Sequence, residues 1–333
     1  MASNSKKKQK RLKDIQHLIN ILDTFQEFHF ISAGIQLGIF DFLEKKKIKA
    51  ETIANTFGFE KELTKAWCEA ATACGYLEKD RDEFYLSRWS KHYLLSHSST
   101  YIGYLCKYTK IIPEVFSDIE ARFRGKRPLM ETQHAMNTVE SIAPIANLAV
   151  PILMQEIPIL RENCHILDLG CGLGSYLINF ALNNPELTGV GVDGGWIAAI
   201  VHEARKNVEK YKLQDRIEIK LADVLELKLN EKFDVILMSG FIQAFKPKNA
   251  LIILKKARDW LKTNGILILQ EMFLDEGRIS PKSNVLLNLL LHLETPEAGL
   301  FEFNQLEELL IIAKFSEIRR MNLIPQITHI IAY

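Results

Sequence analysis

The sequence predicts an α/β protein whose second half forms a doubly wound parallel sheet and whose first half is mostly helical. From His165 onward, short apolar runs alternate with stretches of helical periodicity. Repeated strand–helix units of this kind form parallel sheets that helices cover on both faces. Before His165, apolar residues recur mainly at spacings of three and four, which is typical of helices.

Composition favours a protein with a small-molecule partner. A chain of 333 residues suggests about two domains. It carries 42 Lys and Arg against 41 Asp and Glu, so it has no strong net field to attract nucleic acid or an anionic membrane. No uncharged stretch approaches the roughly 20 apolar residues needed to cross a bilayer.

The cysteines indicate a reducing compartment. There are 5 of them, and none is spaced as C-x-x-C, so neither a disulfide framework nor a zinc site is indicated. The lysine-rich start is not followed by the compact apolar core of a secretion signal. We therefore predict a cytoplasmic protein.

The front domain, predicted over residues 1–110, opens with an amphipathic helix. The apolar side chains that share one helical face are Ile15, Leu18, Ile19, Leu22, Phe25 and Phe28. This stripe has no evident partner within the front domain. We therefore predict a homodimer that forms through the N-terminal domain.

A winged helix-turn-helix is predicted next. A short helix begins near Ala50, a turn follows at Gly58, and a second helix runs from Glu60 until Gly75 stops it. Two short strands then flank the turn at residues 79–82. The second helix and this turn mix acidic with basic residues, whereas a DNA-binding surface needs an excess of cations. We interpret the module as a dimerisation scaffold that also walls a substrate cavity.

Residues 111–161 are predicted to form a helical connector. Five prolines interrupt the helical pattern of this connector, and they are Pro113, Pro128, Pro144, Pro151 and Pro158. Proline removes a backbone donor and tends to break a helix. The connector should therefore consist of several short helices.

The C-terminal domain, residues 162–333, contains the predicted Rossmann-like sheet. Its strands lie near 165–169, 187–193, 217–221, 233–239 and 265–272, with helices near 175–182, 196–211 and 248–261. A helix near 304–313 and strands near 317–322 and 326–333 follow. In such a sheet ligands bind at the carboxyl ends of the strands, where the strand order reverses.

The first strand of this domain leads into a glycine-rich turn, HILDLGCGLGSY. Gly170, Gly172 and Gly174 are spaced G-x-G-x-G, which is tighter than the G-x-G-x-x-G of a dinucleotide site. Asp168 lies at the end of the strand. A carboxylate there would repel a pyrophosphate, whereas it can pair with an ammonium group.

Two further acids end the next two strands. Asp193 is suited to accept hydrogen bonds from both hydroxyls of a ribose. Asp223 stands where an adenine amino group could bind, with Val224 as an apolar neighbour of the ring. Three acids at three successive strand ends indicate a nucleoside-bearing ligand that is not anionic.

These stretches resemble a known family. In order and spacing, DLGCGLG, VGVDGG, LADVLE, FDVILMSG and NGILILQEMF resemble the motifs of class I S-adenosylmethionine-dependent methyltransferases. The front half resembles the O-methyltransferase branch, which includes caffeate and hydroxyindole methylating enzymes and bacterial natural-product tailoring enzymes. The resemblance runs from about Ile15 to Tyr333.

The resemblance implies an enzyme that uses S-adenosylmethionine to methylate a small-molecule acceptor. It also implies an intertwined dimer formed by the front domain. The positions that it assigns to cofactor contact are Gly170, Asp193, Asp223, Val224 and Ser239.

The chain departs from this family after the fourth strand. O-methylating members carry Leu-His-Asp-Trp there, and the histidine takes the proton of the acceptor hydroxyl. Here the stretch is IQAF, and Gln243 cannot act as a base, although it can orient an acceptor oxygen. General-base assistance contributes roughly 10²–10⁴-fold. The family's acidic partner position falls on Asn288, and Glu271 remains as a carboxylate at the end of the fifth strand.

Three explanations of this departure stay open. Another side chain could be the base, with His292 and His134 as candidates. Alternatively, the acceptor needs little deprotonation, as a thioether, thiol, amine or readily enolised 2-oxo acid does. Finally, the domain could bind the cofactor without transferring a methyl group. No spacing argues for a metal, although both histidines with Asp275 could form a facial triad.

Two rival classes are also open. A nucleic-acid methyltransferase acting on exocyclic amines would carry Asn/Asp-Pro-Pro-aromatic after the fourth strand, where SGFI stands instead. A winged-helix regulator without enzymatic activity would need cations on its recognition helix. The sequence thus favours methyl transfer to a small molecule.

Overall fold

The computed structural model describes residues 2–98, 100–126, 132–194, 198–324 and 326–333, with side chains described from residue 15 onward. The chain forms two compact units, residues 1–109 and 110–333. The predicted connector, residues 111–161, falls within the second unit.

The first unit is mostly helical, with one small antiparallel sheet. Its helices are α1 (Ala2–Gln36), α2 (Ile39–Phe42), α3 (Ala50–Phe57), α4 (Lys61–Ala73), α5 (Arg88–Tyr93) and the 3-10 helix η1 (Gly103–Lys107). Its strands are β1 (Ile48–Lys49), β2 (Leu77–Asp80) and β3 (Glu83–Leu86), in the order β1-β3-β2. Helix α1 is longer than the predicted apolar stripe, and β1 was not predicted.

Local signals explain the boundaries of α3 and α4. Gly58 ends α3 in the left-handed conformation, at φ 70°, where a residue without Cβ is favoured. The Glu60 side chain then accepts hydrogen bonds from the backbone N–H groups of Glu62 and Leu63 and so caps α4. The apolar faces of both helices pack into one core with the small sheet.

The second unit begins with the helices of the predicted connector. They are α6 (Tyr108–Ser117), α7 (Ile119–Phe123), α8 (Thr132–Ile142), α9 (Ile145–Glu156) and the 3-10 helix η2 (Pro158–Arg161). Pro144 precedes α9 and Pro158 opens η2, whereas Pro113 and Pro151 lie inside helices that continue through them. Pro128 lies outside the described residues.

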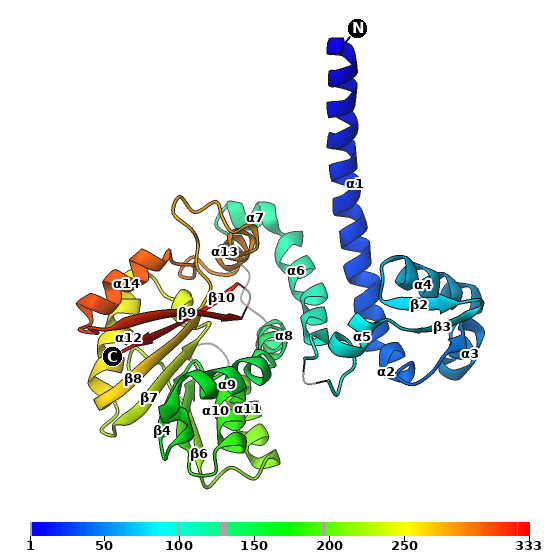
Figure 1. Cartoon of the computed structure of the whole chain (residues 1–333). Helices are drawn as coiled ribbons and strands as arrows, with labels where there is room; N and C mark the ends of the chain where they lie inside the picture. The colour runs from blue at the N-terminus through cyan, green and yellow to red at the C-terminus, as the bar shows by residue number, and fades with distance from the viewer. Residues whose placement is uncertain (1, 99, 127–131, 195–197, 325) are drawn as a thin grey trace. The chain divides into compact units, whose positions relative to one another are not determined.

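A seven-stranded sheet forms the centre of the second unit (Figure 1). Its strands are β4 (His165–Leu169), β5 (Thr188–Asp193), β6 (Ile217–Leu221), β7 (Phe233–Ser239), β8 (Leu261–Glu271), β9 (Ile318–Ile324) and β10 (Ile327–Ala332). Their order is β6-β5-β4-β7-β8-β10-β9. The pairs from β6 to β8 are parallel, and β10 runs antiparallel to β8 and to β9.

Helices cover both faces of this sheet, as the doubly wound prediction requires. The buried side chains of α9, α10 (Ser175–Asn183) and α11 (Ala198–Lys210) pack on one face. Those of α12 (Pro247–Trp260) and α14 (Phe303–Ile312) pack on the other. Among the described residues no single helix is long and apolar enough to cross a membrane, and one bent pair, α8 with α9, passes that test by length and composition only.

Three features differ from the sequence-based expectation. Helix α13 (Lys282–Glu294) was not predicted, because its apolar residues do not form a clear stripe on one face. Strand β8 begins at Leu261, four residues earlier than expected. The predicted start of α11 at Trp196 lies outside the described residues.

Candidate active site

The candidate site lies at the carboxyl edge of the parallel strands. The chain runs from β4 outward through β5 to β6 and then returns to the other side of β4 as β7, so the strand order reverses between β4 and β7. In-register pairing places Asp168 beside Gly191, and side chains alternate between faces along a strand. Asp168, Asp193 and Ser239 therefore share the face that α9, α10 and α11 cover.

The glycine turn fits tightly between β4 and α10. Gly170, Gly172 and Gly174 have φ values of 76°, 52° and 76°, which side chains disfavour. The Gly170 N–H donates to the carbonyl of Val192 on β5 at 2.8 Å. A Cβ built on Gly170 would lie 2.2 Å from Cδ2 of Phe241, so that aromatic ring packs directly on the glycine.

Two carboxylates lie at this turn, Asp168 buried and Asp193 partly buried. Asp168 is 1% exposed, and its Oδ2 has no hydrogen-bond partner among the described residues. Burial, and secondarily the neighbouring Asp193, raises the pKa of Asp168 to about 8. The Asp193 Oδ2 accepts from the Gly172 N–H at 2.8 Å. Burial raises the pKa of Asp193 as well, and backbone hydrogen bonds from Gly172 and Gly194 oppose that rise.

The loop after β6 carries the third predicted acid. The Asp223 Oδ1 accepts from the Leu225 N–H at 2.8 Å, and Val224 is buried. Lys256 on α12 binds the backbone of this loop. Its Nζ donates to the carbonyls of Val224 and Leu227, each at 3.1 Å, and to that of Leu225. All three ammonium donors are thereby used to fix the loop.

The segment that replaces the family's catalytic histidine is the short 3-10 helix η3 (Ile242–Ala244). The Gln243 Oε1 is buried without a hydrogen-bond partner among the described residues, and the backbone carbonyl of Gln243 accepts from the Gly299 N–H at 2.8 Å. A Cβ on Gly299 would lie 2.9 Å from Cε1 of His292 and 3.4 Å from Oδ1 of Asn288. The structure therefore brings Gln243, Asn288 and His292 together around Gly299.

Glu271, the last residue of β8, supports η3. Its Oε1 accepts from the backbone N–H groups of Phe241 at 2.9 Å and Ile242 at 3.0 Å. Burial raises the pKa of Glu271 to about 8, and these two hydrogen bonds oppose the rise. The Glu271 Oε2 has no partner in the described part of the chain. Glu271 thus holds the loop that carries Gln243.

His134 lies in a different environment from the one that a general base needs. It is 4% exposed, with its Nε2 hydrogen-bonded to Oε1 of Glu294 at 2.9 Å and its Nδ1 2.9 Å from Oε2 of Glu114. The second contact has the distance of an ion pair without the angle of a hydrogen bond. The bond to Glu294 raises the pKa of His134 to about 9, against burial and with a further contribution from Glu114. A protonated imidazole has no lone pair with which to accept a proton.

The ion contacts of His134 should make folding stability depend on pH. Because the pKa is raised by folding, the stabilisation is fully present below the unfolded value of about 6.5 and is lost as pH rises through about 9. Glu114 is half exposed, so we discount the effect to about 2 kcal/mol. Urea unfolding of wild type and His134→Gln should show this difference at pH 6 and almost none at pH 10. A difference independent of pH would contradict the assignment, and the exposed His202→Gln serves as the control.

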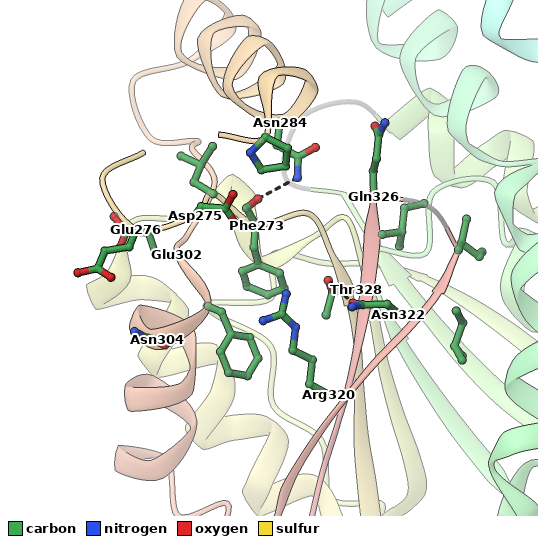
Figure 2. A pocket seen from close by; sticks show the side chains of 16 residues that line it. Phe273, Asp275, Glu276, Asn284, Glu302, Asn304, Arg320, Asn322, Gln326 and Thr328 are labelled. Atoms are coloured by element: carbon green, nitrogen blue, oxygen red, sulfur yellow. Dashed lines mark hydrogen bonds between the residues drawn. The ribbon is translucent and has the colours of Figure 1, made fainter. Parts of the chain in front are cut away.

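A cavity of about 530 Å³, drawn in Figure 2, is lined by other residues. Arg320 on β9 points into it and stacks on Phe303, with its Cζ 4.7 Å from the ring centroid. Three carboxylates, those of Asp275, Glu276 and Glu302, also line the cavity. None of the predicted cofactor or catalytic residues lines it, so we locate the chemistry at the polar strand edge.

Several residues of this region escaped the sequence analysis. Lys256, Tyr176, Gln270 and His329 hold site residues or their loops in place. The available signal was a Gln and a His inside the apolar strands ILILQE and THIIA, where a polar side chain is unusual. Among the described residues, which include His134, His292 and Asp275 of the alternative triad, no group of three or more His, Cys, Asp or Glu side chains could hold a metal ion.

The known proteins that this chain resembles are methyltransferases. Residues 160–294 match the family model described as a methyltransferase domain, so this part of the chain is a methyltransferase domain. The fold of the whole chain is that of O-methyltransferases. A protein of that family from Burkholderia thailandensis superposes with a TM-score of 0.75 at 18% identity, covering 96% of this chain and 97% of that one.

Two further relatives extend the likeness. Human N-acetylserotonin methyltransferase in complex with SAM gives a TM-score of 0.79 at 16% identity, covering 96% of this chain and 97% of its own. The 3-hydroxy-5-methyl-1-naphthoate 3-O-methyltransferase of Streptomyces sahachiroi is 22% identical over 271 residues, which are 78% of this chain and 77% of that protein. The fold class and the resemblance to methyltransferases are confirmed.

Proposed function

We propose that the protein is an S-adenosylmethionine-dependent methyltransferase that acts on a small-molecule acceptor in specialised metabolism. The observation that carries this proposal is the polar strand edge of the methyltransferase domain, where the buried carboxylate of Asp168 and the partly buried carboxylate of Asp193 flank a glycine turn. The naphthoate O-methyltransferase relative supports a small aromatic or natural-product acceptor. The resemblance to O-methyltransferases also supports a winged-helix fold for the first unit.

The residues present fit this cofactor. The Asp168 Oδ2 is buried without a partner among the described residues, and a buried carboxyl group without a counter-charge is unfavourable. A ligand with an ammonium group beside it would provide that counter-charge. With a neutral or anionic ligand, the burial of the Asp168 carboxyl group would remain as unfavourable as before.

The chain's residues have separate roles in this proposal. Asp193 accepts the ribose hydroxyls, Asp223 accepts from the adenine amino group, and Val224 packs against the ring. The turn from Gly170 lets the backbone approach the ligand closely. When bound, S-adenosylmethionine supplies the methyl group of its sulfonium. Alignment of donor and acceptor then lowers the barrier by roughly 7–11 kcal/mol.

We infer that the acceptor atom needs little help from a base. His134 is held between two carboxylates, so its imidazole stays protonated. The amide oxygen of Gln243 can accept a hydrogen bond but cannot take up a proton. His292 is the remaining candidate, and it is exposed on α13 next to Gly299. A nucleophilic acceptor such as a thiol, an amine or an enolised 2-oxo acid suits this set.

Turnover measurements test this inference. With an acceptor in hand, we expect His292→Gln and His134→Gln to keep turnover within about threefold, without a titration in the histidine range. A loss on the order of 10²-fold in His292→Gln, together with disappearance of the limb of the pH profile that reports its deprotonation, would instead establish a relocated base. Asn288→Ala serves as a control for disturbance of the same helix, α13.

The apolar face of α1 supports a homodimer. Leu18, Leu22 and Phe25 are 63%, 62% and 59% exposed, which is costly for large apolar side chains in water. Light scattering at micromolar concentration should give twice the mass of the chain, and Leu22→Glu should shift the protein to monomer. Wild type measured as a monomer would contradict the dimer, and Asn20→Asp, at an exposed polar position of α1, controls for the added charge.

Other parts of the sequence-based hypothesis remain proposals. The basic residues near the hairpin of the first unit pair with neighbouring carboxylates, as in Lys47 with Asp80 and Lys49 with Asp82, which does not favour a phosphate-binding surface. The five cysteines are free, which supports a reducing, cytoplasmic location.

A mass-spectrometric screen tests the function. Purified protein, S-adenosylmethionine and panels of hydroxyl, thiol, amine and 2-oxo acid acceptors should yield a product heavier by one methyl group. Formation of S-adenosylhomocysteine should match it in amount. Absence of transfer to every class, with the cofactor bound, would favour a cofactor-binding protein without methyl transfer.

A further inference from the structure

A ladder of polar side chains crosses three neighbouring strands beside the candidate site. Ser239 on β7 is paired in register with Gln270 on β8, and Gln270 with His329 on β10. The Gln270 Nε2 donates to the Ser239 Oγ at 2.9 Å. The Gln270 Oε1 accepts from the Tyr176 hydroxyl of α10 at 2.6 Å and lies 3.0 Å from the His329 Nε2.

The ladder is enclosed in the protein. His329 is 0% exposed and Gln270 is 5% exposed, and Leu269 and Ile330, their apolar neighbours along the two strands, are each 0% exposed. Burying these groups costs free energy unless their hydrogen bonds are made. Apolar side chains could fill the same space, so a ladder that ends at the candidate site favours a role in that site.

The direction of the hydrogen bonds follows from His329. Its Nδ1 has no hydrogen-bond partner among the described residues, and a buried N–H without a partner is rarer than a buried acceptor without one. The proton therefore belongs on Nε2, which donates to the Gln270 Oε1. Burial lowers the pKa of His329 to about 4, so this neutral form persists near neutral pH.

Gln270 is thereby fixed with its amide oxygen towards His329 and Tyr176 and its amide nitrogen towards Ser239. The Ser239 oxygen accepts that N–H, so its own proton points elsewhere. Ser239 is the last residue of β7, at the carboxyl edge. Its hydroxyl is therefore held as a donor for a group at that edge.

The order of the strands indicates which part of the cofactor would lie beside Ser239. Along the sheet, the proposed adenine contact follows β6, the ribose contact ends β5, the glycine turn follows β4, and Ser239 ends β7. Ser239 thus continues the line past the ribose, on the side of the amino-acid end. That end carries a carboxylate, which accepts hydrogen bonds from hydroxyl donors.

We propose that Tyr176, Gln270 and His329 are positioning residues that direct the Ser239 hydroxyl towards the carboxylate of the cofactor's amino-acid end. The inference rests on the proposed function, because it requires that cofactor. Replacement of Gln270 should therefore lower the affinity for the cofactor only when Ser239 is present. A role limited to folding would instead lower affinity for any ligand of the site.

Calorimetric titration with S-adenosylhomocysteine tests this dependence in a double-mutant cycle. We expect Ser239→Ala and Gln270→Leu each to weaken binding by about 10-fold, and the double variant to bind no worse than the weaker single variant. His329→Gln, which keeps a donor, should bind more tightly than His329→Leu. If Gln270→Leu does not fold, Tyr176→Phe replaces it in the cycle, and His165→Gln, at the amino end of β4, is the control.

A second ligand distinguishes the outcomes. The Ser239→Ala and Gln270→Leu losses should vanish with 5′-methylthioadenosine, which lacks the amino-acid end. Additive losses, or equal losses with both ligands, would overturn the inference and leave the proposed function standing. Failure of wild-type protein to bind either ligand would overturn the proposed function and this inference with it.

Discussion

Asp193→Ala should weaken the binding of S-adenosylmethionine by about 100-fold or more. The reason is that two ribose hydroxyls lose a charged acceptor, and a hydrogen bond to a charged group contributes about 1.5–3 kcal/mol. The substitution also releases the Gly172 N–H, which now donates to the Asp193 Oδ2 at 2.8 Å. Calorimetric titration of the cofactor into both proteins measures the change.

Two controls separate these causes. Asp193→Asn keeps an amide oxygen for Gly172 and removes the charge, so we expect its affinity to fall between those of wild type and Asp193→Ala. Asp215→Ala removes an exposed carboxylate just before β6, and we expect wild-type affinity. Affinity of Asp193→Ala within twofold of wild type would place the ribose elsewhere.

Gly170→Ala should strongly destabilise the second unit. The alanine must adopt φ near 76°, which costs about 1–2 kcal/mol. Its Cβ would also overlap the Phe241 ring at 2.2 Å, and such overpacking costs about 1–3 kcal/mol. We therefore expect the free energy of unfolding to fall by about 3 kcal/mol, as measured by urea denaturation, and cofactor binding to weaken as Phe241 moves.

Gly125→Ala is the matched control for this variant. Gly125 has φ 80°, and a Cβ there would meet no atom of the described residues within 4 Å. It therefore reports the backbone strain without the clash. Equal destabilisation of the two variants would show that the contact between Phe241 and Gly170 does not constrain the turn.

The fold could be predicted from sequence wherever one pattern dominated a segment. The strands from His165 to Ser239 are short apolar runs, or in β6 an alternation of apolar and charged residues, that glycine or an acid follows or ends. Helix α13 escaped because its apolar residues surround the helix, so periodicity does not distinguish it. Strand β8 extends back to Leu261 because that residue pairs with Phe233 across a bulge, which a sequence does not reveal.

The candidate site also contains residues that could be predicted from the sequence and residues that could not. Asp168 and Asp193 could be predicted because parallel strands bring their carboxyl ends to one edge, so distance along the chain does not matter. The environment of His134 could not be predicted, since Glu114 and Glu294 come from helices far apart in sequence. Nor could the ladder from Ser239 to His329, which depends on the register of β8 against β10.

The most direct test is a crystal structure of the protein with S-adenosylhomocysteine bound. The account predicts the ribose hydroxyls within hydrogen-bond distance of the Asp193 carboxylate, the adenine against Val224, and the amino-acid end beside Asp168 and Ser239. Density for the ligand in the cavity that Arg320 lines, or at any place away from the carboxyl edge of β4 and β5, would contradict it.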